Sequence, residues 1–125
     1  MMRLDIASLA AAYRDGRCTP QQMIEHVQDR IRQHEANPIW ISRTAPAALQ
    51  ARAAELAKVR PDSLPLYGIP FAVKDNIDVA GLPTTAACPW FSHSPATSAT
   101  VVRKLVDAGA IVIGKTNLDQ FATGL

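Results

Sequence analysis

Apolar residues recur at helical spacing through the first sixty positions of the chain. A first helix is predicted from a cap at Asp5 to a stop at Gly16. Its apolar face consists of Ile6, Leu9 and Tyr13. The pattern therefore begins with an amphipathic helix.

The strongest helix signal follows, in "CTPQQMIEHVQDRIRQHE" (18–35). Thr19 as N-cap, Pro20 at the first helical position and Gln22 at the third form a capping box. The apolar stripe of this helix is Met23, Ile24, Val27 and Ile31. An extended piece (37–42) and a third helix (45–59) that packs through Leu49, Ala53 and Leu56 come next.

From Leu66 the pattern changes to apolar runs of strand length. A buried strand is predicted at 69–73, a loop at 78–89, and a second buried strand at 110–114. Between them lies a helix with a cap at Thr97 or Ser98 and an end at Gly109; its apolar residues are Val101, Val102, Leu105 and Val106. A last helical turn is expected in 117–125.

Strand, helix and strand at this spacing predict a βαβ unit with a parallel pair. The predicted fold class is α/β, with a helical layer in residues 1–60 and the start of a mixed β-sheet core in 61–125. Such a sheet normally pairs and covers its strands on both sides. We therefore expect an incomplete domain with exposed apolar edges, prone to aggregation.

Composition narrows the possible partners and compartments. The net charge of +2 comes without a basic tract, which argues against nucleic acid, and no stretch approaches the ~20 apolar residues of a membrane span. Two cysteines, Cys18 and Cys88, are too few for a disulfide framework or a metal clip. Asp5 interrupts the apolar start, which therefore reads as a helix and not a secretory signal. We expect a cytoplasmic protein.

The segment "GAIVIGKT" (109–116) matches the phosphate-loop pattern GxxxxGK[ST]. That pattern needs a flexible loop after a strand, whereas here the variable positions are a β-branched strand after a helix. Gly109 is better explained as a helix C-cap and Gly114 as a turn at the end of the strand. A nucleotide-binding module is the alternative of another class, testable by titration with ATP and Mg²⁺.

Cys88 and His93 could be a nucleophile and its base. Five residues of spacing in a loop do not establish contact, and a lone cysteine beside proline is usually a small buried apolar residue. The interpretation favoured by the sequence is structural.

Lys74 ends the apolar run of "LYGIPFAVKDNIDVAGLPTTAACP" (66–89). Burial disfavours the charged form of a lysine, and a neutral amine can act as a general base. Alternatively, Lys74 emerges at the strand end and pairs with Asp75 or Asp78. The residues alone leave both interpretations open, with the ion pair favoured.

The same segment, followed by "ATVVRKLVDAGAIVIGKTNLDQFATGL" (99–125), closely resembles the N-terminal part of amidase-signature hydrolases. Its "TTAACP" and "NLDQFATGL" runs are most similar to those of allophanate hydrolases. The resemblance implies the amidase-signature fold and a Ser-cis-Ser-Lys triad in which Lys74 is the catalytic lysine. The bridging and nucleophilic serines of the family lie in a later segment that this sequence does not contain. We therefore expect the 125 residues alone to be inactive and to lack the contacts that would shelter Lys74.

The resemblance further implies hydrolysis of allophanate with release of ammonia in urea degradation. The hydrolase itself would need no cofactor and no metal; a biotin-dependent urea carboxylase would make its substrate, and the full-length protein could be a homodimer. Alternatives within the family are a broad-specificity amidase and a protein similar to an amidotransferase subunit. A noncatalytic binding fragment is a further alternative.

Overall fold

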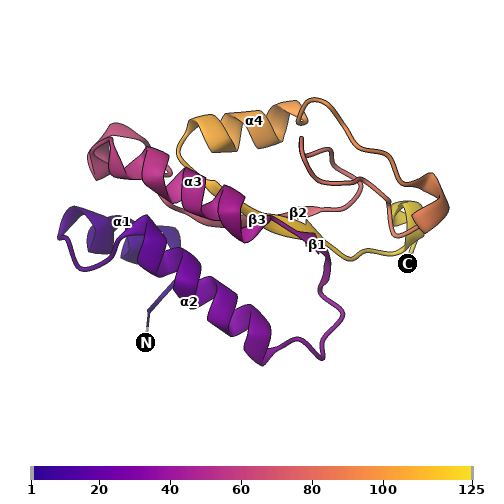
Figure 1. Ribbon diagram of the computed structural model, residues 1–125, viewed down its shortest axis with the longest axis horizontal. Helices are drawn as coiled ribbons and strands as arrows, with labels where there is room; N and C mark the ends of the chain where they lie inside the picture. The colour runs from indigo at the N-terminus through magenta and orange to yellow at the C-terminus, as the bar shows by residue number, and fades with distance from the viewer. Residues whose placement is uncertain (1, 125) are drawn as a thin grey trace.

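The computed structural model describes residues 2–124 and shows helices on both sides of a small mixed sheet (Figure 1). The helices are α1 (Ile6–Arg14), α2 (Pro20–Gln33), α3 (Pro46–Ala57) and α4 (Thr100–Asp107), and the strands are β1 (Trp40–Arg43), β2 (Pro70–Lys74) and β3 (Ile111–Thr116). Three short 3₁₀ turns are η1 (Pro61–Ser63), η2 (Pro89–Phe91) and η3 (Gln120–Ala122). The predicted α/β class is confirmed.

The local signals of the helical half are confirmed by its capping contacts. The Thr19 hydroxyl accepts a hydrogen bond from the backbone N–H of Gln22, and the Gln22 side chain accepts one from the Thr19 N–H, as a capping box requires. Asp5 caps α1 by accepting from the Ser8 N–H, which lowers the pKa of the Asp5 carboxyl. Ile6 was placed wrongly on the buried face of α1: it is 55% exposed, because it is the first helical residue and projects beyond the core.

The sheet has the strand order β1-β3-β2, so β3 lies in the centre. β3 pairs parallel to β2, which confirms the βαβ unit, and antiparallel to β1, a strand from the helical half of the chain. Both predicted strands extend further toward their carboxyl ends than the apolar pattern indicated. Lys74 is the last residue of β2 and aligns with Thr116, because the ladder continues through polar residues.

Gly114 corrects one interpretation, because it lies within β3 and not in a turn at its end. A Cβ at this position would come 2.5 Å from the carbonyl oxygen of Ser42 and 2.9 Å from the Cα of Arg43. Glycine is needed here so that β1 can approach β3 closely, beside a shift in the pairing register. Gly109, by contrast, follows α4 with φ +104, which confirms it as a helix stop.

The start of α4 also differs from its prediction. The N-cap is Ala99, without a side-chain hydrogen bond, and neither Thr97 nor Ser98 caps the helix. The Ser98 hydroxyl instead accepts from the backbone N–H of Ala80, so it ties the preceding loop to the helix start. Val101 is 54% exposed, whereas Val102 is buried.

Two apolar clusters lie on the sheet. The larger joins α1, α2 and α3 to the sheet through residues that include Leu9, Ile111 and Ile113, and the smaller joins α4 to β2 through Val102 and Val73. Figure 1 shows α4 on the side of the sheet away from α1 and α2. The core thus holds β2 and β3 firmly and directs their carboxyl ends to the same edge.

A buried hydrogen bond fixes α1 to the chain just before β2. The Tyr13 hydroxyl donates to the carbonyl oxygen of Gly68 at 2.7 Å, and burial raises the pKa of this hydroxyl. Gly68 has φ +67, and a Cβ there would lie 2.7 Å from the Tyr13 ring. The entry of β2 into the sheet therefore depends on a glycine.

Three aromatic side chains outside the sheet are exposed. Trp90 is 98% exposed, and Phe91 and Phe121 are each 48% exposed and stack edge-to-face at 5.2 Å between ring centroids. The last helical turn is only the 3₁₀ turn η3, in which Phe121 has φ 54. None of the helices within residues 2–124 has the length and apolar character to cross a membrane.

Candidate active site

The candidate site lies where β2 and β3 end side by side. The register aligns Lys74 with Thr116 and Val73 with Lys115. Parallel strands present their carboxyl ends at one edge, which is where open α/β sheets bind ligands. Lys74 therefore lies at the edge of the sheet where a ligand site is expected.

The Lys74 side chain is exposed, and no residue in 2–124 makes a hydrogen bond or an ion pair with its amine. The predicted alternative, an ion pair with Asp75 or Asp78, is wrong. Asp75 pairs with Lys115, and Asp78 accepts from the Thr84 hydroxyl and pairs with His93. Within residues 2–124 the amine is therefore unsheltered.

Asp75 and Lys115 form an ion pair that is completely buried. The Lys115 Nζ lies 2.7 Å from Asp75 Oδ1, and both side chains have 0% exposure. At this distance, away from water, the two opposite charges attract each other strongly. Sequence reasoning missed the pair: it considered Asp75 as a partner for Lys74 and Lys115 as part of a phosphate loop.

The loop at 83–87 surrounds this ion pair with hydrogen bonds. The Lys115 amine also donates to the carbonyl oxygen of Pro83 at 3.3 Å and to the Thr84 hydroxyl at 3.4 Å. The other Asp75 oxygen, Oδ2, accepts from the Thr85 N–H at 3.1 Å and from the Thr85 hydroxyl. Additional hydrogen bonds of this kind are needed to offset the cost of removing both charges from water. Here they also bind the loop to the ends of β2 and β3.

The backbone of the same loop is strained at two alanines. Ala86 has φ 51 and Ala87 φ 60, in the left-handed region that disfavours residues with a Cβ. The Ala86 N–H donates to the Asp75 carbonyl oxygen at 3.0 Å, and the Ala86 carbonyl oxygen accepts from the Phe121 N–H at 2.9 Å. These contacts hold the strained turn between β2 and the segment after β3.

We predict that Ala87→Gly raises the free energy of unfolding, because glycine adopts positive φ without steric cost. The gain should be up to about 1 kcal/mol, since the flexibility of glycine in the unfolded chain offsets part of it. The matched control is Ala54→Gly at an exposed position of α3, which should lose about 1 kcal/mol. Urea denaturation measures the change in the free energy of unfolding of both variants. A lower free energy of unfolding in Ala87→Gly would show that the backbone of Ala87 is not strained.

The two weaker motifs do not assemble sites. The His93 ring pairs with Asp78 at 3.3 Å, and in the described part of the chain it makes no hydrogen bond with Cys88. Lys115 is buried against Asp75, so it is not available to a phosphate, which agrees with the rejection of a phosphate loop. No group of three metal-binding side chains gathers within residues 2–124.

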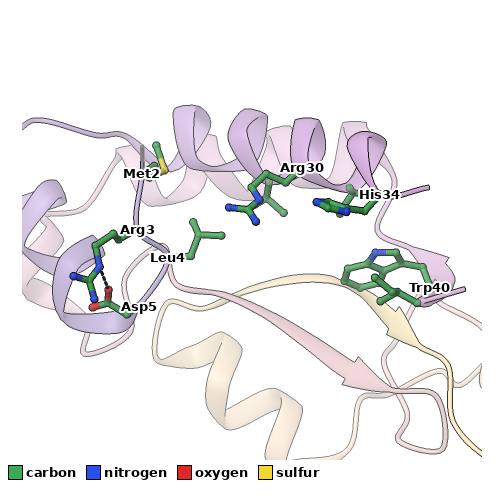
Figure 2. A pocket seen from close by; sticks show the side chains of 10 residues that line it. Met2, Arg3, Leu4, Asp5, Arg30, His34 and Trp40 are labelled. Carbon is green, nitrogen blue, oxygen red and sulfur yellow. Dashed lines mark hydrogen bonds and ion pairs between the residues drawn. The ribbon is translucent and has the colours of Figure 1, made fainter. Parts of the chain in front are cut away.

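A separate apolar hollow of about 480 Å³ lies between the N-terminal segment, α2 and β1. Figure 2 shows His34 and Trp40 at one end of it, the Arg3–Asp5 ion pair at the other, and Leu4 and Arg30 between them. Its lining includes no residue of the 74–88 loop or of β3. The hollow is therefore not part of the candidate site.

Comparison with known proteins decides the family. The family model described as Amidase matches residues 22–125. The chain belongs to the amidase family. This amidase chain is 50% identical over 114 residues to the urea amidolyase of Lachancea kluyveri, a match that spans 88% of this chain and 6% of that protein.

Two further comparisons show the range of the family. Selenomethionine-substituted allophanate hydrolase of Kluyveromyces lactis has a TM-score of 0.75 and 46% identity, over 89% of this amidase chain and 19% of that one. A subunit of the mitochondrial glutamyl-tRNA(Gln) amidotransferase of Ornithorhynchus anatinus is 39% identical over 99% of this chain and 24% of that protein. The amidase chain thus spans a quarter or less of the length of these three relatives, and its mixed α/β architecture is that of amidase-signature structures.

Proposed function

We propose that this chain is the lysine-bearing part of an allophanate hydrolase, an amide hydrolase of the Ser-cis-Ser-Lys type. The observation that carries the proposal is the unpaired Lys74 amine at the carboxyl end of β2, in a chain 50% identical to a urea amidolyase. Burial by the rest of an amidase domain would favour the neutral form of a lysine at this position. A neutral amine can act as a general base.

In the proposed reaction, Lys74 accepts a proton through a bridging serine from a nucleophilic serine. The serine oxygen bonds to the terminal amide carbon of allophanate, backbone N–H groups stabilise the oxyanion, and the carbon–nitrogen bond breaks. The proton held by Lys74 returns to the leaving nitrogen, so ammonia departs. Water then hydrolyses the acyl-enzyme by the same proton route. Both serines would come from the rest of the amidase domain, so the 125 residues alone should release no ammonia.

The relatives favour allophanate over the other substrates of the family. Identity is 50% to the urea amidolyase and 39% to the amidotransferase protein. By this proposal the substrate comes from a biotin-dependent urea carboxylase. Homodimerisation and a cytoplasmic location remain predictions.

Substrate comparison tests the proposal. Residues 1–125 are joined to the rest of Kluyveromyces lactis allophanate hydrolase in place of its own equivalent segment; we call this protein the chimeric hydrolase. It should release ammonia from allophanate with a kcat/KM at least tenfold above that for acetamide or glutamine. A folded chimera without activity on allophanate, or one that prefers simple amides, would reject the assignment. The 125-residue chain alone is the negative control.

A further inference from the structure

The Asp75–Lys115 pair is the one fully buried ion pair that the described residues form, and it lies beside the proposed base. Every other ion pair in residues 2–124 includes at least one partner whose side chain is more than 40% exposed. Burying two charges is expensive, and a pair of apolar residues would usually be no less stable. Stability alone therefore does not explain why charges occupy this position.

Asp75 is the carboxylate with the shortest covalent path to Lys74. An exposed amine and a neighbouring carboxylate on the same chain would attract each other, and the resulting pair would hold the amine in its charged form. In the structure the two side chains diverge: Lys74 is exposed, whereas Asp75 is buried against Lys115. Asp75 is the first residue after β2, which ends at Lys74.

The backbone of Asp75 is held on two sides. The Asp75 N–H donates to the Thr116 carbonyl oxygen at 3.1 Å, next to Lys115, and the Asp75 carbonyl oxygen accepts from Ala86. Asp75 and Lys115 thus clamp the end of β2 between β3 and the loop at 83–87. The carboxyl end of β2 cannot turn Asp75 outward without breaking both the ion pair and the Thr85 hydrogen bonds.

We propose that Lys115 is a positioning residue for the hydrolase: it binds the Asp75 carboxylate and so keeps Asp75 from pairing with the Lys74 amine. This inference rests on the proposed function of Lys74. The remaining titratable side chains on the segments around Lys74 are Asp78, Cys88, His93 and Asp119. Of these, Asp78 and His93 already pair with each other.

The test is the pH dependence of kcat/KM for allophanate in the chimeric hydrolase carrying Lys115→Gln. Glutamine can still donate an N–H toward Asp75, but it carries no charge and its side chain is one atom shorter. The Asp75 carboxylate then lacks its countercharge, and an uncompensated anion beside Lys74 favours the protonated amine. We expect the acid limb of the profile to move upward by about one pH unit. Lys104→Gln removes the same charge from an exposed position of α4 and should leave the limb in place.

The double variant Asp75→Asn/Lys115→Gln distinguishes charge from packing. It removes both charges but keeps an acceptor for Thr85, so its acid limb should return to that of the parent. An unshifted limb in folded Lys115→Gln, or a double variant displaced as far as the single one, would overturn the inference. If Lys115→Gln fails to fold, the pH profiles of Asp75→Asn/Lys115→Gln and of Asp75→Asn are compared with that of the parent instead. An acid limb at higher pH than the parent's in either variant would refute the inference about Lys115.

Failure of the inference can be told apart from failure of the proposed function. Lys74→Ala is measured in the same chimera. Retained turnover in that variant would reject the proposed base itself, whereas an unshifted Lys115→Gln limb in an enzyme that needs Lys74 rejects only the role of Lys115.

Discussion

Replacing Lys74 by alanine in the chimeric hydrolase should lower kcat for allophanate by about 10²–10⁴-fold, the range that a general base contributes. The physical reason is that an unpaired amine at the end of β2 takes the proton of the serine nucleophile, and alanine cannot. Since the Lys74 side chain is exposed and makes no ion pair within residues 2–124, its loss should cost the fold little. The KM should change much less than kcat.

The matched control is Lys104→Ala, which removes an exposed lysine from α4. Both variants are compared with the parent by ammonia release and by thermal denaturation. A Lys74→Ala protein that turns over allophanate at the parental rate would show that the amine is not the base. A large fall in melting temperature would show instead that Lys74 supports the structure.

Breaking the buried ion pair should have the largest effect on stability. Lys115→Met leaves the Asp75 carboxylate buried without its countercharge, and removal of one partner of such a pair costs about 3–5 kcal/mol. Replacing both partners by apolar residues, Asp75→Leu with Lys115→Met, should recover most of that loss, except for the hydrogen bonds of Thr85. Urea denaturation of the chimeric hydrolase measures both.

The control for this prediction is an exposed pair, Arg60 and Asp62, whose side chains are 82% and 52% exposed. Arg60→Met should change stability little, because water already solvates both charges. A Lys115→Met protein as stable as Arg60→Met would mean that the buried pair contributes nothing net. The double replacement would then have no loss to recover.

Local features of the fold were predictable from the sequence because their partners lie within a few residues. The capping box of Thr19 and Gln22 is an example: two side chains three positions apart satisfy each other's backbone groups. The stop at Gly109 is another, since only its own backbone angle decides it. The position of Lys74 at a strand end also followed from the apolar run before it.

Features that depend on distant partners were not predictable. Gly114 is required by the approach of β1, which lies about seventy positions earlier in the chain. Asp75 and Lys115 pair although they are forty positions apart, and the hydrophobic periodicity of the sequence does not predict such a contact. Ser98 looked like a helix cap, but its hydroxyl binds Ala80 across the loop. In each case tertiary contacts determine the role of the residue, and the local sequence is compatible with more than one role.

The role of Lys74 as a proton acceptor can be tested most directly by chemical rescue. Turnover of allophanate by the Lys74→Ala chimera is measured with increasing methylamine, with the Lys74→Met chimera as a control whose side chain fills the space. Our account predicts a loss of turnover that methylamine partly restores in the alanine variant, in proportion to its unprotonated concentration, and not in the methionine variant. Parental turnover of Lys74→Ala without any added amine would contradict it.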